Sequence, residues 1–231
     1  MQATPRIFPI GIQDFEQLRM RNYVYVDKTD LVYKLVSTNQ IYFLSRPRRF
    51  GKSLLLSTLR AYFLGKKDLF KGLAMEQLET EWQTHPVLEI SFSDSKYIEV
   101  DNLRSLLDNT LSEWEALYGS APTEKTFNLR FKGVIRRAYE QTKQQVVVLI
   151  DEYDSPILSA MGADMEQRRT ELRGIMRDFF SPLKGSGKYI RFLFITGITK
   201  FSQLSIFSEL NHLDNISMLE EYSSICGITE T

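Results

Sequence analysis

The sequence has little of what disulfides, metal clusters and catalytic Cys/His sites require. Its 231 residues include one cysteine, Cys226, so an intramolecular disulfide is excluded. The two histidines, His85 and His212, are widely separated, and they form no cluster from which a zinc or Cys/His site could be built. We therefore expect the protein to work in a reducing cytoplasm.

Net charge and long apolar runs are also missing. Lys plus Arg and Asp plus Glu each total 29, which removes any global electrostatic argument for binding nucleic acid or a membrane. The N-terminus shows no basic segment followed by an apolar stretch, and charges interrupt every window of the length that a bilayer demands. We expect neither export nor a membrane span.

Internal repeats, low-complexity tracts and Pro/Ser-rich linkers are absent, so nothing marks a domain boundary. A chain of this length with 43% apolar residues suits one folded domain. We expect residues 1–231 to form that domain, with 41–231 as its core and 1–40 as an N-terminal segment.

Short apolar runs at 41–44, 87–92, 146–150 and 192–195 have the length of strands buried on both faces. Segments with helical periodicity alternate with them, at 54–63, 100–117, 127–138 and 172–180. This alternation predicts an α/β fold: a three-layer αβα domain with a mostly parallel central sheet of about five strands. Ligands of such sheets bind at the carboxyl ends of the strands.

The residues after the first run read Ser-Arg-Pro-Arg-Arg-Phe-Gly-Lys-Ser over 45–53, and a helical segment follows. A phosphate-binding loop needs backbone amides at a helix N-terminus, a close-approach glycine, a lysine for the β- and γ-phosphates and a hydroxyl for Mg²⁺. Gly51, Lys52 and Ser53 meet the last three needs. The expected nucleotide-binding residues are Arg48, Arg49, Phe50, Gly51, Lys52, Ser53 and Leu54.

This loop departs from the pattern G-x-x-x-x-G-K-[ST] at its first glycine, which falls on Arg46. The backbone there must either avoid a glycine-dependent conformation or be strained. The alternative interpretation of the segment is that Gly51 ends a loop and Lys52 opens a helix as an ordinary solvated residue.

Two carboxylates follow the third apolar run, at Asp151 and Glu152. In this arrangement the first carboxylate belongs to the Mg²⁺ shell and the second acts as the catalytic base toward water. Thr196 ends the fourth run, where a polar side chain can orient the attacking water or contact the γ-phosphate. The alternatives are a solvated acidic turn at 151–152 and a local backbone turn at Thr196.

The basic cluster Arg46, Arg48 and Arg49 could neutralise phosphate charge, contact a second subunit or act as a finger in trans. The simpler alternative is that these are surface residues paired with carboxylates. Upstream, we predict that Thr29 or Asp30 caps a short helix.

With these motifs in place, the sequence resembles the bacterial AAA-ATPase-like family, which is related to archaeal and signalling-type P-loop ATPases. The matching blocks are PIGIQDF at 9–15, YVDKT at 25–29, RPRRFGKSL at 46–54, IDEYD at 150–154, TGITKFS at 196–202 and ICGIT at 225–229. The resemblance implies that Pro-Arg-Arg-x-Gly-Lys-Ser replaces the glycine-rich loop, and that ATP and Mg²⁺ are the ligands. It also implies that residues 9–29 complete the nucleotide pocket.

Members of this family usually continue into a helical lid and a nuclease-like domain, whereas this sequence ends at Thr231. We expect a fragment, a truncated product or a stand-alone ATPase core, and the resemblance does not support a nuclease activity for it. A lid normally supplies an arginine near the γ-phosphate, so its absence would affect hydrolysis more than binding.

Two functions follow from the sequence. One is an ATPase whose hydrolysis drives or switches a protein partner, another domain or a second copy of the chain. The other is a nucleotide-binding interaction module with little turnover. Nucleic-acid binding has only the local arginine cluster in its favour, and the preference for ATP over GTP rests on the resemblance.

Overall fold

The protein is built on one parallel sheet, seen in a computed structural model that describes residues 7–93, 97, 99–160, 165–199, 206–207, 210 and 213–227. The strands are β1 (Ile41–Ser45), β2 (Val87–Ser91), β3 (Val146–Asp151), β4 (Ile190–Gly197) and β5 (Asp214–Asn215). Within the described residues all neighbouring strands of the sheet are parallel, in the order β2-β3-β4-β1-β5.

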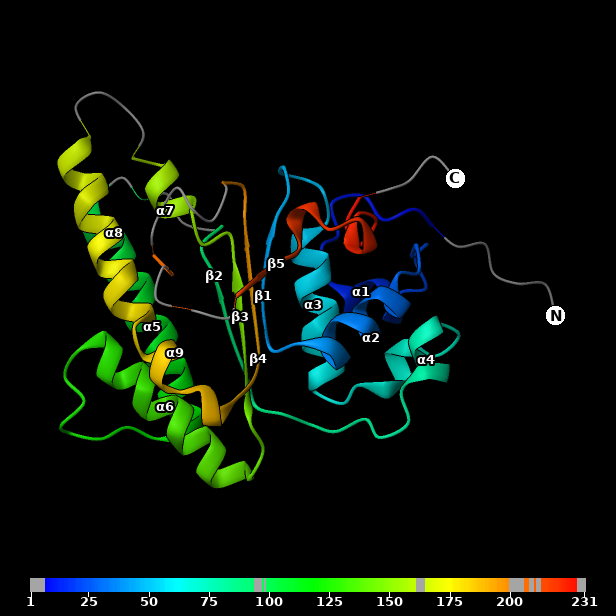
Figure 1. Cartoon of the computed structure of the whole chain (residues 1–231), viewed down its shortest axis with the longest axis horizontal. Coiled ribbons are helices and arrows are strands. Elements are labelled where there is room, and N and C mark those ends of the chain that lie inside the picture. Colours follow the sequence, from blue (N-terminus) through cyan, green and yellow to red (C-terminus); the bar gives the residue numbers. More distant parts are fainter. Residues whose placement is uncertain are drawn as a thin grey trace.

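Helices cover both faces of this sheet (Figure 1). One face carries α1 (Phe15–Met20), α2 (Thr29–Thr38), α3 (Lys52–Phe63) and α4 (Ala74–Leu78). The other carries α5 (Val100–Tyr118), α6 (Phe127–Thr142), α7 (Ser155–Leu158), α8 (Glu166–Phe180) and α9 (Pro182–Gly185). Short 3₁₀ turns are η1 (Lys67–Phe70), η2 (Gly187–Tyr189), η4 (Ile216–Met218) and η5 (Glu220–Tyr222). The predicted three-layer α/β class is confirmed.

Strand β3 shows how the period of a strand places a functional residue. Its six residues are all buried because helices lie on both faces. Val146 and Val148 belong to the core shared with α5, α6 and α8, whereas Val147 and Leu149 belong to the core shared with α3. Side chains alternate along a strand, so Asp151 follows the second series and faces α3.

The strand order brings the three predicted polar segments together. Strand β4 lies between β1 and β3, with Ser45 opposite Gly197 and Ile150 opposite Ile195. The loop after β1, the acidic turn after β3 and the end of β4 therefore meet at the carboxyl edge of the sheet, where ligands bind in this class of fold.

Two local predictions differ from the structure. The short strand β5 follows no apolar run, because its two residues, Asp214 and Asn215, are exposed. Helix α2 is capped by neither Thr29 nor Asp30: the Asp27 carboxylate accepts the Thr29 backbone N–H at 2.9 Å and its hydroxyl at 2.7 Å. Asp27 thus satisfies the first amide of the helix from outside.

Some residues used in the sequence analysis lie outside the described residues, namely His212, residues 200–202 and residues 228–229. In the part of the chain that the structure describes, no helix combines the length and the apolar character needed to cross a membrane.

Candidate nucleotide-binding site

The loop between β1 and α3 avoids strain at Arg46. Positive φ angles occur instead at Arg49 (66°) and at Gly51 (85°). Gly51 is the N-cap of α3, and a Cβ added to it would meet nothing within 4 Å. Open space therefore lies above the glycine at the N-terminus of a 12-residue helix, where unpaired amides and the helix dipole favour an anion.

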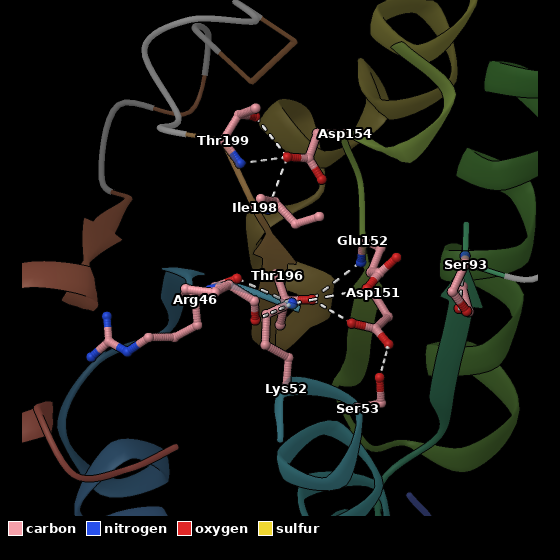
Figure 2. A network of polar contacts seen from close by, with 12 residues as sticks. Arg46, Lys52, Ser53, Ser93, Asp151, Glu152, Asp154, Thr196, Ile198 and Thr199 are labelled. Carbon is pink, nitrogen blue, oxygen red and sulfur yellow. Dashed lines mark hydrogen bonds and ion pairs between the residues drawn. The ribbon is translucent and has the colours of Figure 1, made fainter. Parts of the chain in front are cut away.

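Arg46 points away from this loop (Figure 2). Its guanidinium donates to the backbone carbonyls of Ser217 and Tyr222, and the backbone N–H of Arg46 donates to the Gly197 carbonyl at 3.2 Å. Arg48 and Arg49 are exposed. The ion pairs between described residues include none of the three arginines, so pairing with carboxylates does not account for them.

Lys52 is not an ordinary solvated residue, because only 4% of it is exposed. Its Nζ donates to the carbonyls of Arg46 and Pro47, each at 3.2 Å, and lies 3.9 Å from Oε1 of Glu152. The loop thus curls around the ammonium group with its carbonyls. A buried ammonium held by neutral carbonyls and one distant carboxylate is a strong attractor for additional negative charge.

A chain of hydrogen bonds joins the start of α3 to the ends of β3 and β4 (Figure 2). Ser53 Oγ donates to Asp151 Oδ2 at 2.6 Å, and Thr196 Oγ1 donates to Asp151 Oδ1. The same Thr196 oxygen accepts the Glu152 backbone N–H at 3.1 Å. Thr196 is completely buried, and its hydroxyl contacts the acidic turn of the neighbouring strand. The alternative of a local backbone turn before Gly197 therefore does not account for this hydroxyl.

Glu152 sits on a backbone that glutamate rarely adopts, with φ at 51°. Its side chain is 16% exposed. Burial raises the pKa of this carboxyl, Lys52 opposes the shift, and the charge of Asp151 adds to it. A carboxylate whose proton affinity is increased, next to a lysine and beside a polar edge, has the properties of a general base.

The donor set suits Mg²⁺ bound together with a phosphate. Among the described residues, no cluster of three or more His, Cys, Asp or Glu side chains could hold a metal ion. The Ser53 hydroxyl and the Asp151 carboxylate, 2.6 Å apart, are hard oxygen ligands. Mg²⁺ commonly takes one or two protein oxygens and completes its shell with water and phosphate oxygens, so these residues fit the ion.

A cavity of about 350 Å³ lies beside the loop. Its apolar wall comes from the N-terminal segment, α3 and the C-terminal segment, with Ile12, Val24, Val32, Leu54, Leu55 and Ile225 among the lining residues. Lys28 Nζ donates to the carbonyls of Ser224 and Gly227, and the Gly227 N–H donates to the Phe50 carbonyl at 2.8 Å. Three segments distant in sequence are thus joined around one cavity.

The other side of Ser53 and Asp151 carries a polar cavity of about 370 Å³. Arg60 spans it, with ion pairs to Asp14 at 2.5 Å and to Glu89 at 3.2 Å. Burial raises the pKa of Glu89, an effect that Arg60 opposes. Neither this network nor the role of Lys28 was found in the sequence. The predicted strand 87–92 includes Glu89, but no sequence pattern indicated that its partner is Arg60 of α3.

This parallel sheet, with a Gly-Lys-Ser loop after β1 and an Asp-Glu turn after β3, is the arrangement of P-loop nucleotide-binding proteins. The chain belongs to the AAA-ATPase-like family, described as predicted AAA-ATPases, which matches residues 9–207. The family description gives coarse support for nucleotide binding and for ATPase activity.

One relative is the "Uncharacterized protein in vnfD 5'region" of Azotobacter chroococcum mcd 1. The two are 42% identical over 227 residues, which cover 96% of this chain and 43% of that protein. The chain thus spans less than half the length of this relative. No solved structure matches the chain.

Proposed function

We propose that the chain binds ATP with Mg²⁺ and hydrolyses it, and that the hydrolysis drives or switches a protein partner or another domain. The observation that carries the proposal is the contact chain Ser53–Asp151–Thr196–Glu152, which ends 3.9 Å from the buried Lys52 ammonium. Binding groups for phosphate, oxygen ligands for Mg²⁺ and a base for water are thereby within one cluster.

We assign phosphate binding to the loop after β1. The first amides of α3 and the ammonium of Lys52 attract the β- and γ-phosphates. Lys52 then exchanges the carbonyls of Arg46 and Pro47 for phosphate oxygens, which are stronger partners because they are charged. Exposed Arg48 and Arg49 add positive charge beside the site.

Ser53 and Asp151 are the proposed Mg²⁺ residues. They would hold the ion, which would supply positive charge to neutralise the negative charge that develops during phosphoryl transfer. Thr196 fixes the Asp151 carboxylate and the Glu152 backbone, because it donates to Asp151 and accepts the backbone N–H of Glu152. Glu152 in turn orients a water molecule for in-line attack and withdraws its proton.

The nucleobase is proposed to occupy the apolar cavity beside the loop. This cavity adjoins Gly51 and Leu54, so it lies next to the phosphate-binding amides. Its apolar lining suits a flat aromatic base. The N-terminal segment, 1–40, completes this pocket through residues such as Ile12 and Val24. The preference for adenine stays a proposal from the family.

A nucleotide-binding interaction module with little turnover is the second candidate. One observation favours it: Lys52 already has the carbonyls of Arg46 and Pro47 and the Glu152 carboxylate as neighbours. If this resting arrangement persists with nucleotide bound, Glu152 is held near Lys52 rather than near water.

Thermal unfolding with and without Mg²⁺-ATP tests the binding step. At a concentration of a hundred times Kd, a ligand that binds only the native state raises the free energy of unfolding by about 2.7 kcal/mol. This corresponds to an increase of about 5–10 °C in Tm for a chain of this size. We expect this shift in the wild type and its loss in Lys52→Ala. Equal shifts in both proteins, or no shift in the wild type, would contradict the proposed site.

A further inference from the structure

We propose that Asp154 is a positioning residue, which holds Glu152 in its left-handed conformation by fixing the chain that leaves β4. This inference rests on the proposed function, since it assigns a task to Asp154 in the work of Glu152. Nothing in the sequence marked Asp154 apart from its place in the IDEYD block.

The carboxylate of Asp154 is completely buried. It accepts hydrogen bonds from residues 198–199, which form the exit turn directly after β4. Its Oδ2 accepts the Ile198 N–H at 2.8 Å, the Thr199 N–H at 2.6 Å and the Thr199 hydroxyl at 2.7 Å (Figure 2). Hydrogen bonds to a charged acceptor are stronger than neutral ones, and burial increases the effect. Asp154 therefore anchors the chain directly after β4.

Helix capping does not explain this carboxylate. Asp154 occupies the N-cap of α7, where an aspartate normally accepts an N–H of its own helix. Its side chain makes no such bond, and α7 has only four residues. The carboxylate reaches across to the β4 exit turn instead, so its contacts serve the link between the two strand ends.

The two exit turns are in contact along their length. The Tyr153 N–H donates to the Thr196 carbonyl at 3.0 Å. A Cβ built on Gly197 would lie 2.5 Å from a ring carbon of Tyr153, so only glycine permits this approach. Contacts thus run in register from Asp151 and Thr196 to Asp154 and Thr199.

Glu152 lies between the two ends of this register. Its φ of 51° is unfavourable for a residue with a Cβ, and such a conformation persists only where the surroundings impose it. The Thr196 hydroxyl accepts the Glu152 backbone N–H, and the Asp154 carboxylate anchors the chain two residues further on. Weakening the anchor lets Glu152 relax and turns its carboxylate away from the site.

The test measures kcat, KM, ATP affinity and Tm for the wild type, Asp154→Asn, Glu152→Gln and the double variant. We expect Asp154→Asn to lower kcat about tenfold or more while ATP affinity changes less than about threefold. If Asp154 acts through Glu152, the double variant has the kcat of Glu152→Gln alone, because a base that is already missing cannot be mispositioned.

Two further variants separate positioning from general stability. Glu79→Gln alters another carboxylate that accepts two backbone N–H groups and one hydroxyl, those of Glu81, Trp82 and Tyr62, before the start of β2. It should lower Tm comparably without changing kcat. Thr199→Ser should keep kcat near the wild-type value, whereas Thr199→Val should lower it.

A kcat for Asp154→Asn within twofold of the wild type would overturn the inference, and so would losses that multiply in the double variant. Failure of the proposed function has a different signature. In that case the wild type shows no turnover above Lys52→Ala, before any Asp154 variant is compared.

Discussion

At the scale of the residue, Lys52 influences the protonation of Glu152. Their charged atoms are 3.9 Å apart in a site where the side chain of Lys52 is 3% exposed and that of Glu152 16% exposed. The lysine lowers the pKa of Glu152, but desolvation is the larger effect and the net shift is upward. Glu152 therefore binds a proton more readily than an exposed glutamate does.

A pH dependence of turnover follows from this shift. The base works only when deprotonated, so kcat/KM, which reports the free enzyme, should fall as the pH decreases through the raised pKa of Glu152, starting above the ordinary glutamate value of about 4.3. Lys52, Asp151, Arg48 and Asp154 are the charged groups that influence this pKa. The measurement is kcat/KM for Mg²⁺-ATP across pH. An unchanged acid limb in Glu152→Gln would assign the limb to another group.

At the scale of the element, the strands could be read from the sequence because burial on both faces leaves an uninterrupted apolar run. The runs at 41–44, 87–92, 146–150 and 192–195 correspond to β1 through β4. The face that Asp151 occupies was not predicted, because residues 146–150 are all apolar and only the structure shows how they divide between the two cores. Strand β5 could not be predicted, since its two exposed residues pair with β1 through the backbone alone.

The loop between β1 and α3 shows what a sequence motif cannot predict. The motif located Gly51, Lys52 and Ser53, but a pattern of residue types does not give backbone angles. The sequence left open whether the backbone at Arg46 adopts a strained, glycine-like conformation. The positive φ occurs at Arg49 instead. Arg46, Lys28 and Asp154 each have hydrogen-bond partners that lie 44 to 199 residues away in sequence. Such contacts exist only once the sheet has formed.

Gly51→Ala tests the cap of α3. Its φ of 85° should cost alanine about 1 kcal/mol in stability, although the added Cβ meets nothing in the protein. In the proposed complex that Cβ would intrude on phosphate, so ATP affinity should also fall. Gly72→Ala is a matched control, with φ at 74° and nothing within 4 Å, in the turn before α4. Calorimetry should show similar destabilisation in both and weaker ATP binding only for Gly51→Ala; equal affinities would contradict the proposed cradle.

At the scale of the whole molecule, the apolar cavity proposed for the nucleobase is lined by segments from both ends of the described chain. Lys28 bonds to the carbonyls of Ser224 and Gly227, and Gly227 bonds to the loop residue Phe50. Burial lowers the pKa of Lys28, so its charge is retained at a cost that the carbonyl partners offset. The folded sheet thus brings three distant segments into one proposed pocket.

Lys28→Met should loosen that pocket. We expect ATP affinity to fall about tenfold, equivalent to about 1.4 kcal/mol, while kcat at saturation stays close to wild type. Lys34→Met is the control, because Lys34 joins the same two regions through an exposed ion pair with Glu221 at 2.7 Å, a kind of contact that contributes little. Titration of both variants with Mg²⁺-ATP provides the comparison. Equal losses of affinity in the two would argue against a specific role for Lys28.

The most direct test of hydrolysis at this site is single-turnover phosphate release from Mg²⁺-ATP by the wild type, Lys52→Ala and Glu152→Gln. Loss of a general base costs about 100-fold or more in rate. We predict release by the wild type, no tight binding by Lys52→Ala, and intact binding with release slowed by at least that factor for Glu152→Gln. Equal rates for wild type and Glu152→Gln would contradict the assignment of Glu152 as the base.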